Sequence, residues 1–139
     1  MTDSAEDTVT AFLAALEDLD VDRALSYAAP GIVYQNVPLP AARGIRAVGG
    51  QLRAMAKVGS GFEVRMHSIA TKGTTVLTER TDVLKVGPVA AEFWVCGTFE
   101  VHEGRITLWR DYFDWPTFLF SWLRGAVRAV LRTPARRSS

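Results

Sequence analysis

An arginine and an aspartate stand two residues apart inside an apolar, strand-like segment, "VLTERTDVLKV", at residues 76–86. Because side chains alternate along a strand, Arg80 and Asp82 share one face. A charged pair on an apolar face predicts either a reaction site that neutralises its own charges or an exposed ion pair of small energy. Alternation leaves both interpretations open, since the opposite face also carries apolar residues. The face that includes the pair reads Val76, Thr78, Arg80, Asp82, Leu84 and Val86.

Another aspartate lies between aromatic rings in "ITLWRDYFD", residues 106–114, where Trp109, Asp111 and Phe113 share a face. Two carboxyl groups in one apolar pocket can serve as acid and base, because repulsion and desolvation separate their pKa values. An aspartate between two large aromatic side chains is not expected to be simply solvated. The alternative is structural: Asp111 caps a backbone group or pairs with an arginine for stability.

Two polar side chains share a face of the short segment "VYQNVPLP", residues 33–40. Tyr34 can donate and accept hydrogen bonds through its hydroxyl, and Asn36 through its amide. Taken alone, the pattern favours the simpler interpretation, in which Tyr34 packs in the core and Asn36 begins a turn.

Motifs of metal and phosphate sites are missing from the sequence, which has no HExxH, no CxxC and no glycine-rich phosphate loop. His67 and His102 do not form a metal set with the single cysteine, Cys96. We expect both histidines to be surface or core residues and Cys96 to be a small core residue. The sequence therefore shows no recognisable metal or phosphate motif.

The periodicity predicts helices first and a run of strands afterwards, which is typical of the α+β class. A curved, mixed but mainly antiparallel sheet with the N-terminal helices on its concave face would leave a pocket between the two layers. The expected helices cover residues 9–16, with Ser4 as a cap, 22–28, 45–58 and 117–132; the expected strands cover residues 32–36, 61–70, 74–86, 90–101 and 105–114.

Length and composition fit one domain, residues 1–132, followed by a basic tail at 133–139 that we expect to be disordered. The chain has 139 residues, of which 48% are hydrophobic, and a net charge of +1. Five arginines and no acids follow Asp114, which leaves 11 basic against 15 acidic residues, a net charge of −4, for residues 1–114. An acidic body argues against nucleic-acid binding.

The location predicted from the sequence is the cytoplasm. The single cysteine suits a reducing compartment, the acidic N-terminus is no signal peptide, and no run approaches the roughly 20 apolar residues of a membrane span. Stable membrane insertion is therefore not expected. The terminal helix has apolar and arginine positions and could lie on a membrane surface, but closure of a core or of a dimer face is the favoured interpretation.

The three polar clusters together resemble the limonene-1,2-epoxide hydrolase family, within the group of folds like nuclear transport factor 2, SnoaL and ketosteroid isomerase. The matching stretches are "VYQNVPLP", "LTERTDVL" and "ITLWRDYFD", and the resemblance runs from about Val9 to Phe120. It implies a cone-shaped, cystatin-like fold, a homodimer and a cofactor-independent epoxide hydrolase.

The resemblance also implies a role for each polar residue. Asp82 would protonate the epoxide oxygen, Asp111 would take a proton from water, and Arg80 would hold both carboxyl groups. Tyr34 and Asn36 would position the water with Asp111, and the product would be a vicinal diol formed in one step. The expected apolar wall of the substrate site comprises Val76, Leu84, Trp109 and Phe113.

Two other functions stay open at the level of sequence. An isomerase or cyclase could use the same scaffold, although it needs a base and an oxyanion donor but no held water. A non-catalytic binding or dimerisation module could also enclose a pocket, because a fold does not determine a function.

Overall fold

The structure is a computed structural model that describes residues 4–132, so the tail predicted at 133–139 lies outside the described residues. Its helices are α1 (Ala5–Glu17), α2 (Val21–Leu25), α3 (Ile45–Val58) and α4 (Trp115–Arg132). Its strands are β1 (Ala28–Val37), β2 (Ala42–Arg43), β3 (Gly61–Lys72), β4 (Thr75–Val86), β5 (Val89–His102) and β6 (Arg105–Tyr112).

Helix α1 begins where the sequence predicts a cap. The backbone N–H of Asp7 donates to the Ser4 hydroxyl over 3.1 Å, which satisfies one of the free donors of the first turn. Val9, Phe12 and Leu16 then follow at helical spacing and are at most 1% exposed. This buried stripe packs α1 on the sheet and supplies much of the core.

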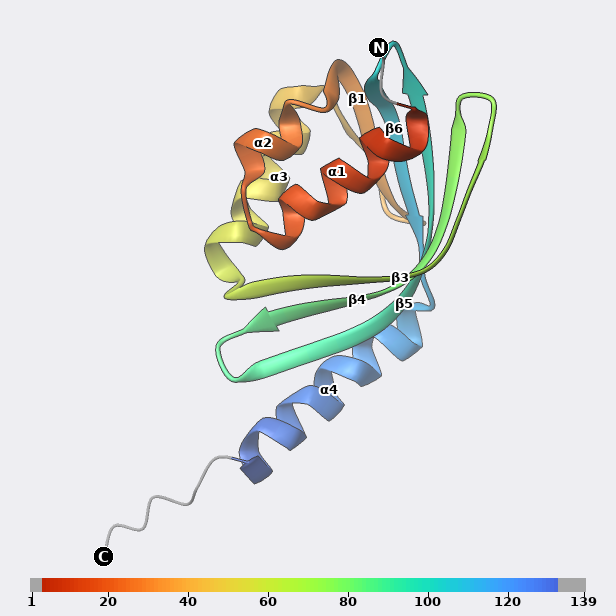
Figure 1. The fold of residues 1–139 in the computed structure, drawn as a ribbon. Coiled ribbons are helices and arrows are strands. Elements are labelled where there is room, and N and C mark those ends of the chain that lie inside the picture. Colours follow the sequence, from red (N-terminus) through yellow and green to blue (C-terminus); the bar gives the residue numbers. More distant parts are fainter. Residues whose placement is uncertain (1–3, 133–139) are drawn as a thin grey trace, which may run out of the picture.

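The sheet has the strand order β2-β1-β6-β5-β4-β3. Strands β1 and β6 run parallel, whereas the other neighbours run antiparallel. Helices α1, α2 and α3 lie together on the concave side of this curved sheet, and α4 extends from its other end (Figure 1). The predicted α+β architecture is therefore confirmed, and its two layers enclose the space in which the polar clusters meet.

Two predicted boundaries were wrong near Pro30. Helix α2 ends at Leu25 rather than near Ala28, and β1 is ten residues long rather than five. The pairing of β1 with β6 is irregular between Ala28 and Val33, so Pro30 falls in a stretch where the register shifts. A proline is tolerated there, because no regular ladder requires its missing N–H.

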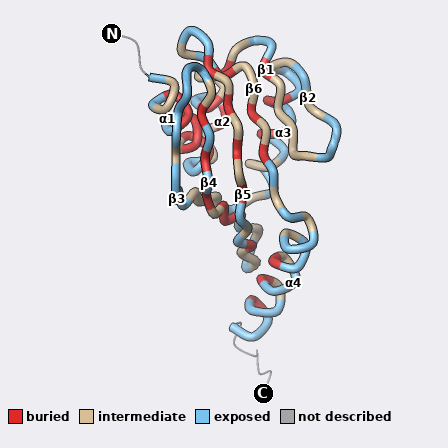
Figure 2. Tube along the Cα trace, turned by 90° about the vertical axis from the view of Figure 1, so that its right-hand side faces the viewer, coloured by how far each residue is buried: buried red, intermediate tan, exposed pale blue. Residues whose placement is uncertain are grey.

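Residues of strand β4 alternate between a buried and an exposed face, and Arg80 and Asp82 lie on the buried one. Val76, Thr78, Arg80 and Asp82 are at most 4% exposed, whereas Leu77 and Glu79 are exposed. In Figure 2 the buried stretches follow the central strands, while β3 at the edge is mostly exposed. The face that carries Arg80 and Asp82 is therefore the inner one.

Candidate active site

Arg80 joins two carboxyl groups inside the fold. Its Nε donates to Asp82 Oδ1 over 2.8 Å, and its Nη2 donates to Asp82 Oδ2 over 3.2 Å and to Asp111 Oδ2 over 2.9 Å. The relative exposure of Arg80 is 1%, and that of each aspartate is 4%. Buried charges require such pairing, because desolvation is otherwise costly. Among residues 4–132, no buried side-chain nitrogen or oxygen lacks a hydrogen-bond partner.

A glycine on the strand between them allows this bridge to form. Arg80 lies on β4 and Asp111 on β6, so the guanidinium must cross β5, where Gly97 pairs with both Thr78 and Asp111. A Cβ at Gly97 would lie 2.5 Å from Arg80 Nη1, 2.8 Å from Thr78 Oγ1 and 2.9 Å from Asp111 Oδ1. Only glycine leaves room for the three groups. Arg80 Nη1 donates to the Thr78 hydroxyl over 3.0 Å, which fixes the remaining arm of the fork.

Burial makes both carboxyl groups harder to ionise. It raises the pKa of Asp82 from 3.8 to about 6, although Arg80 acts in the opposite direction. Burial likewise raises the pKa of Asp111, against the lowering effects of Arg80 and of a hydrogen bond from Trp109. For Arg80, burial lowers the pKa, but the two aspartates outweigh it and the pKa lies above its usual range. One cation, one carboxylate and one protonated carboxyl group form the neutral arrangement, in which the pair titrates as a unit.

Tyr34, Asn36 and Trp109 surround the Asp111 carboxyl group. The parallel register places Asn36 opposite Asp111 and Tyr34 opposite Trp109. Trp109 Nε1 donates to Asp111 Oδ1 over 3.0 Å, and the Asn36 amide donates to the Tyr34 hydroxyl over 3.1 Å. Burial raises the pKa of Tyr34 above its usual range, so this hydroxyl remains protonated and can donate. Two polar groups that could hold a water molecule therefore lie on the strand next to Asp111.

Helix α1 holds the Trp109 ring in position from the other layer. Phe12 meets that ring edge-on, with centroids 4.9 Å apart, and Tyr34 stacks on it at 3.8 Å. The indole is 4% exposed, so its rotamer is fixed by packing on both sides. The orientation of the Asp111 carboxyl group thus depends on α1 as well as on the sheet.

A cavity of about 200 Å³ opens beside these groups and is mainly apolar. Asp82 and Asp111 both lie in its wall, together with Tyr34 and Asn36. The remaining wall residues are Leu16, Met55, Phe62, Leu84, Phe93, Trp109, Phe113, Trp115 and Phe118. Two ionisable groups on an apolar wall are the usual form of a small-molecule site.

The structure differs from the sequence-based assignment at two residues. Val76 is fully buried in the hydrophobic core and is not part of the cavity wall, because it lies near the opposite end of β4 from Leu84. Cys96 is half-buried rather than a core residue. Its register opposite Glu79 and Tyr112 places it on the outer face of the sheet.

The histidines take no part in the site. His67 is exposed and lies 2.7 Å from the Thr81 hydroxyl, and His102 is exposed beside Glu100. Within the described range, no group of three or more histidine, cysteine, aspartate or glutamate side chains could hold a metal ion.

Several residues of the site were not predicted from the sequence. A glycine inside the strand-like stretch "VCGTF" was a usable signal for Gly97, because an internal strand glycine often marks a close approach. Thr78 shares the face of Arg80 and Asp82, but no role was predicted for it. The wall residues Leu16 and Met55, from α1 and α3, carried no local signal, since only the packing of the two layers brings them to the cavity.

The sequence of residues 3–124 matches the protein-family model of the limonene-1,2-epoxide hydrolase catalytic domain. The chain belongs to the limonene-1,2-epoxide hydrolase family. A relative from Mycobacterium tuberculosis (strain ATCC 25618 / H37Rv) named epoxide hydrolase EphG is 48% identical over 123 residues, which cover 88% of this chain and 82% of that protein.

Solved structures agree with this membership. The structure of an M. tuberculosis epoxide hydrolase of this family type is 47% identical with a TM-score of 0.86, and the match covers 91% of this chain and 95% of that one. An NTF2-like protein of unknown function from Burkholderia pseudomallei has a TM-score of 0.75 at 14% identity, covering 85% and 96% of the two chains. The second likeness shows the fold alone.

Proposed function

We propose that this limonene-1,2-epoxide hydrolase family member adds water to an apolar epoxide and releases a vicinal diol. The observation that carries the proposal is the Asp82–Arg80–Asp111 bridge, buried in the wall of an apolar cavity. Family membership and the name of the 48% identical relative support the same reaction class. Nine of the wall residues have apolar or indole side chains, which supports an apolar substrate.

Epoxide opening needs a proton donor at the oxygen and a proton acceptor at the water. In the proposed step Asp82 donates its proton to the epoxide oxygen, while Asp111 accepts one from the water. The water oxygen forms a bond to one ring carbon as that carbon's bond to the epoxide oxygen breaks. A proton then returns from Asp111 to Asp82 through solvent. Side chains of the chain supply both transfers, so the proposed reaction uses no cofactor.

The surroundings of each carboxyl group support this division of roles. Asp111 accepts from both Trp109 and Arg80 and has Asn36 opposite it on β1, which suits a base that holds water. Asp82 has a pKa of about 6 because of burial, which keeps its proton within reach near neutral pH. Tyr34 and Asn36 would orient the water toward Asp111.

The proposal is tested with a panel of apolar epoxides in water labelled with oxygen-18. We expect diol carrying one labelled oxygen in a single turnover, with no label in the protein. Asp111→Asn keeps the shape of the base but cannot accept a proton, so diol formation should fall at least about 100-fold. Label in the protein would refute direct attack by water, and an active Asp111→Asn enzyme would refute the base. Binding of epoxides without any diol would indicate a non-catalytic binding module.

We also propose a homodimer that forms through the outer face of the sheet. Leu77, Trp94 and Tyr112 lie on that face and are 52%, 47% and 40% exposed. Large side chains of this kind are enriched in protein interfaces. A cytoplasmic location and the lack of a nucleic-acid partner stay predictions from the sequence. Within residues 4–132, no helix is both long and apolar enough to cross a membrane.

A further inference from the structure

Helix α4 contacts the sheet through Phe118 near its start, which meets Phe93 of β5 edge-on with ring centroids 4.8 Å apart, and through small residues further along. Ser121, Gly125 and Ala129 are its buried positions, one turn apart. Strand β6 pairs with β5 over residues Cys96–His102, whereas α4 packs against the beginning of β5, near Ala90. The approach is so close that a Cβ at Gly125 would lie 2.3 Å from the carbonyl oxygen of Ala90. Beyond Phe118, the predicted closure by this helix therefore involves only a narrow face of small residues.

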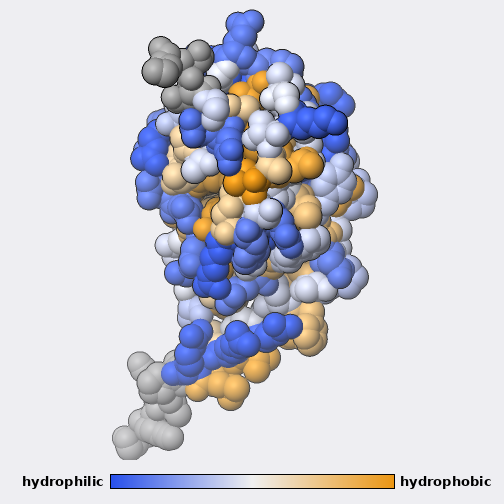
Figure 3. Space-filling model, turned by 45° about the vertical axis from the view of Figure 1, so that its right-hand side comes forward, coloured by the Kyte–Doolittle hydropathy of each residue, from blue (hydrophilic) through white to orange (hydrophobic). Residues whose placement is uncertain are grey.

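The opposite face of α4 exposes large apolar side chains. Their relative exposures run from 49% to 78%, and part of the face forms a shallow hollow of about 240 Å³ whose wall is entirely apolar. In Figure 3 this apolar surface lies directly beside a hydrophilic ridge at the lower end of the molecule. A contiguous apolar surface of this kind marks an interaction site. The exposed residues are Leu119, Phe120, Leu123, Val127, Val130 and Leu131.

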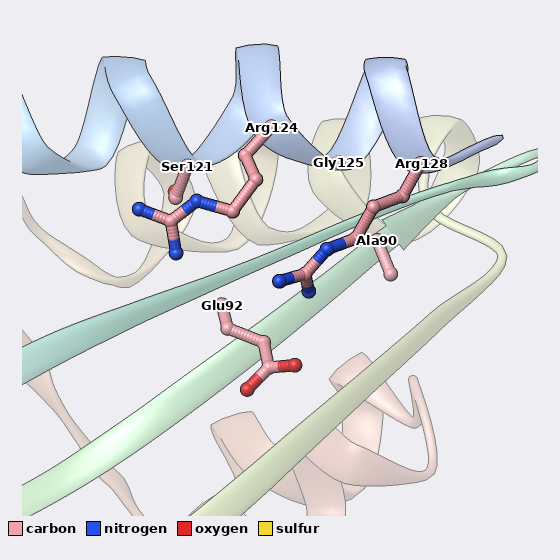
Figure 4. Close-up of a pocket in the computed structure, with 6 residues that line it drawn as sticks. All are labelled: Ala90, Glu92, Ser121, Arg124, Gly125 and Arg128. Atoms are coloured by element: carbon pink, nitrogen blue, oxygen red, sulfur yellow. The ribbon is translucent and has the colours of Figure 1, made fainter. Parts of the chain in front are cut away.

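The arginines of α4 form one row beside that apolar surface. Arg124, Arg128 and Arg132 are one turn apart, and Figure 4 shows the first two reaching from α4 toward the side where Glu92 lies. Among residues 4–132, no carboxylate lies within 4.0 Å of these three arginines, and Glu92 is paired with Arg65. The row therefore presents unneutralised positive charge on an otherwise acidic molecule.

The positive charge of α4 favours an anionic partner for this face over a second copy of the chain. Residues 115–139 contain five arginines and no acid, so two copies packed through α4 would add like charges without compensation. An anionic lipid surface offers both an apolar interior for the large side chains and phosphates for the arginines. The net charge of −4 on residues 1–114 would turn the body away from that surface.

We propose that α4 docks in the surface of an anionic phospholipid bilayer. The helix lies in the interface with Leu123 and Val130 in the lipid and Arg124 and Arg128 at the headgroups. Its first turn supplies Trp115 and Phe118 to the wall of the cavity, so docking brings the cavity close to the lipid. Uptake of an apolar epoxide from the bilayer would rest on the proposed function, whereas docking itself does not.

The test is co-sedimentation of the full chain with vesicles of phosphatidylcholine containing 30% phosphatidylglycerol, against vesicles of phosphatidylcholine alone. We expect binding to the anionic vesicles that weakens as salt is raised. Arg124→Gln with Arg128→Gln should lower the partition coefficient about 25-fold, at about fivefold per charge. The matched control is Arg43→Gln with Arg46→Gln, which removes two exposed arginines elsewhere and should leave binding unchanged.

The apolar contribution is tested by Leu123→Gln, with Val58→Gln, at the end of α3, as the control at similar exposure. Only Leu123→Gln should weaken vesicle binding. Hydrolysis of a water-soluble epoxide should be unchanged in all these variants, which separates failure of docking from failure of the proposed function. Equal loss in variants and controls, or no vesicle binding by the wild type, would overturn the proposal. If sedimentation velocity shows that Leu123→Gln turns a dimer into a monomer, the partner is a second copy and the proposal is wrong.

Discussion

Replacing Asp82 by asparagine should remove a large pH dependence from the stability of the fold. Burial raises the pKa of Asp82 from 3.8 to about 6, so between these values the folded protein holds a proton that the unfolded chain releases. A group with a raised folded pKa stabilises the fold at low pH, and that contribution is lost as pH rises through about 6. The difference between the two pKa values corresponds to about 3 kcal/mol of the free energy of unfolding, at about 1.4 kcal/mol per pH unit.

The measurement is urea unfolding followed by tryptophan fluorescence at several pH values from 4 to 7. Because asparagine does not titrate, the free energy of unfolding of Asp82→Asn minus that of the wild type should rise by most of this 3 kcal/mol over the range. Taking the difference cancels the titration of groups that do not interact with Asp82, while the coupled titration of Asp111 remains in it. Glu79→Gln, on the exposed face of the same strand, controls for the loss of one carboxyl group.

A difference that stays flat or falls with pH would refute the reasoning. It would mean that Arg80, at 2.8 Å, outweighs burial and keeps Asp82 ionised in the folded state. The proposed acid would then lack its proton at neutral pH. The variant should also be inactive while it is at least as stable as the wild type at pH 7, which separates a catalytic role from a structural one.

Three other substitutions probe the same site. Arg80→Lys should lower kcat at least about 100-fold, because one ammonium cannot donate to both carboxyl groups as the fork does; near-normal turnover would refute the bridge. Gly97→Ala should lower the free energy of unfolding by about 1–3 kcal/mol in urea and remove most of the activity in the diol assay. Gly31→Ala is the control, because no atom lies within 4 Å of its added Cβ, and it should change neither stability nor activity. Tyr34→Phe should lower kcat less than Asp111→Asn does, because Asn36 still holds the water; an equal loss in the diol assay would contradict that ranking.

Much of the fold could be predicted because alternation and helical periodicity are local properties. The predicted range of α3, residues 45–58, agrees at both ends, and the inner face of β4 is the one that carries Arg80 and Asp82. The boundaries near Pro30 were wrong, because β1 is extended by pairing with β6, about 75 residues later in the chain. No local sequence pattern predicts pairing between strands so far apart in the chain.

The sequence by itself determined which side chains could do chemistry: two aspartates and an arginine on strand faces, with Tyr34 and Asn36 before a turn. Spacing along a strand is enough for that, since the pleat assigns every second residue to one face. Only the tertiary structure decided that Arg80 reaches Asp111 across Gly97, that Val76 lies away from the cavity, and that α4 leaves its large residues exposed. These facts depend on register between strands and on packing between layers, which long-range contacts determine.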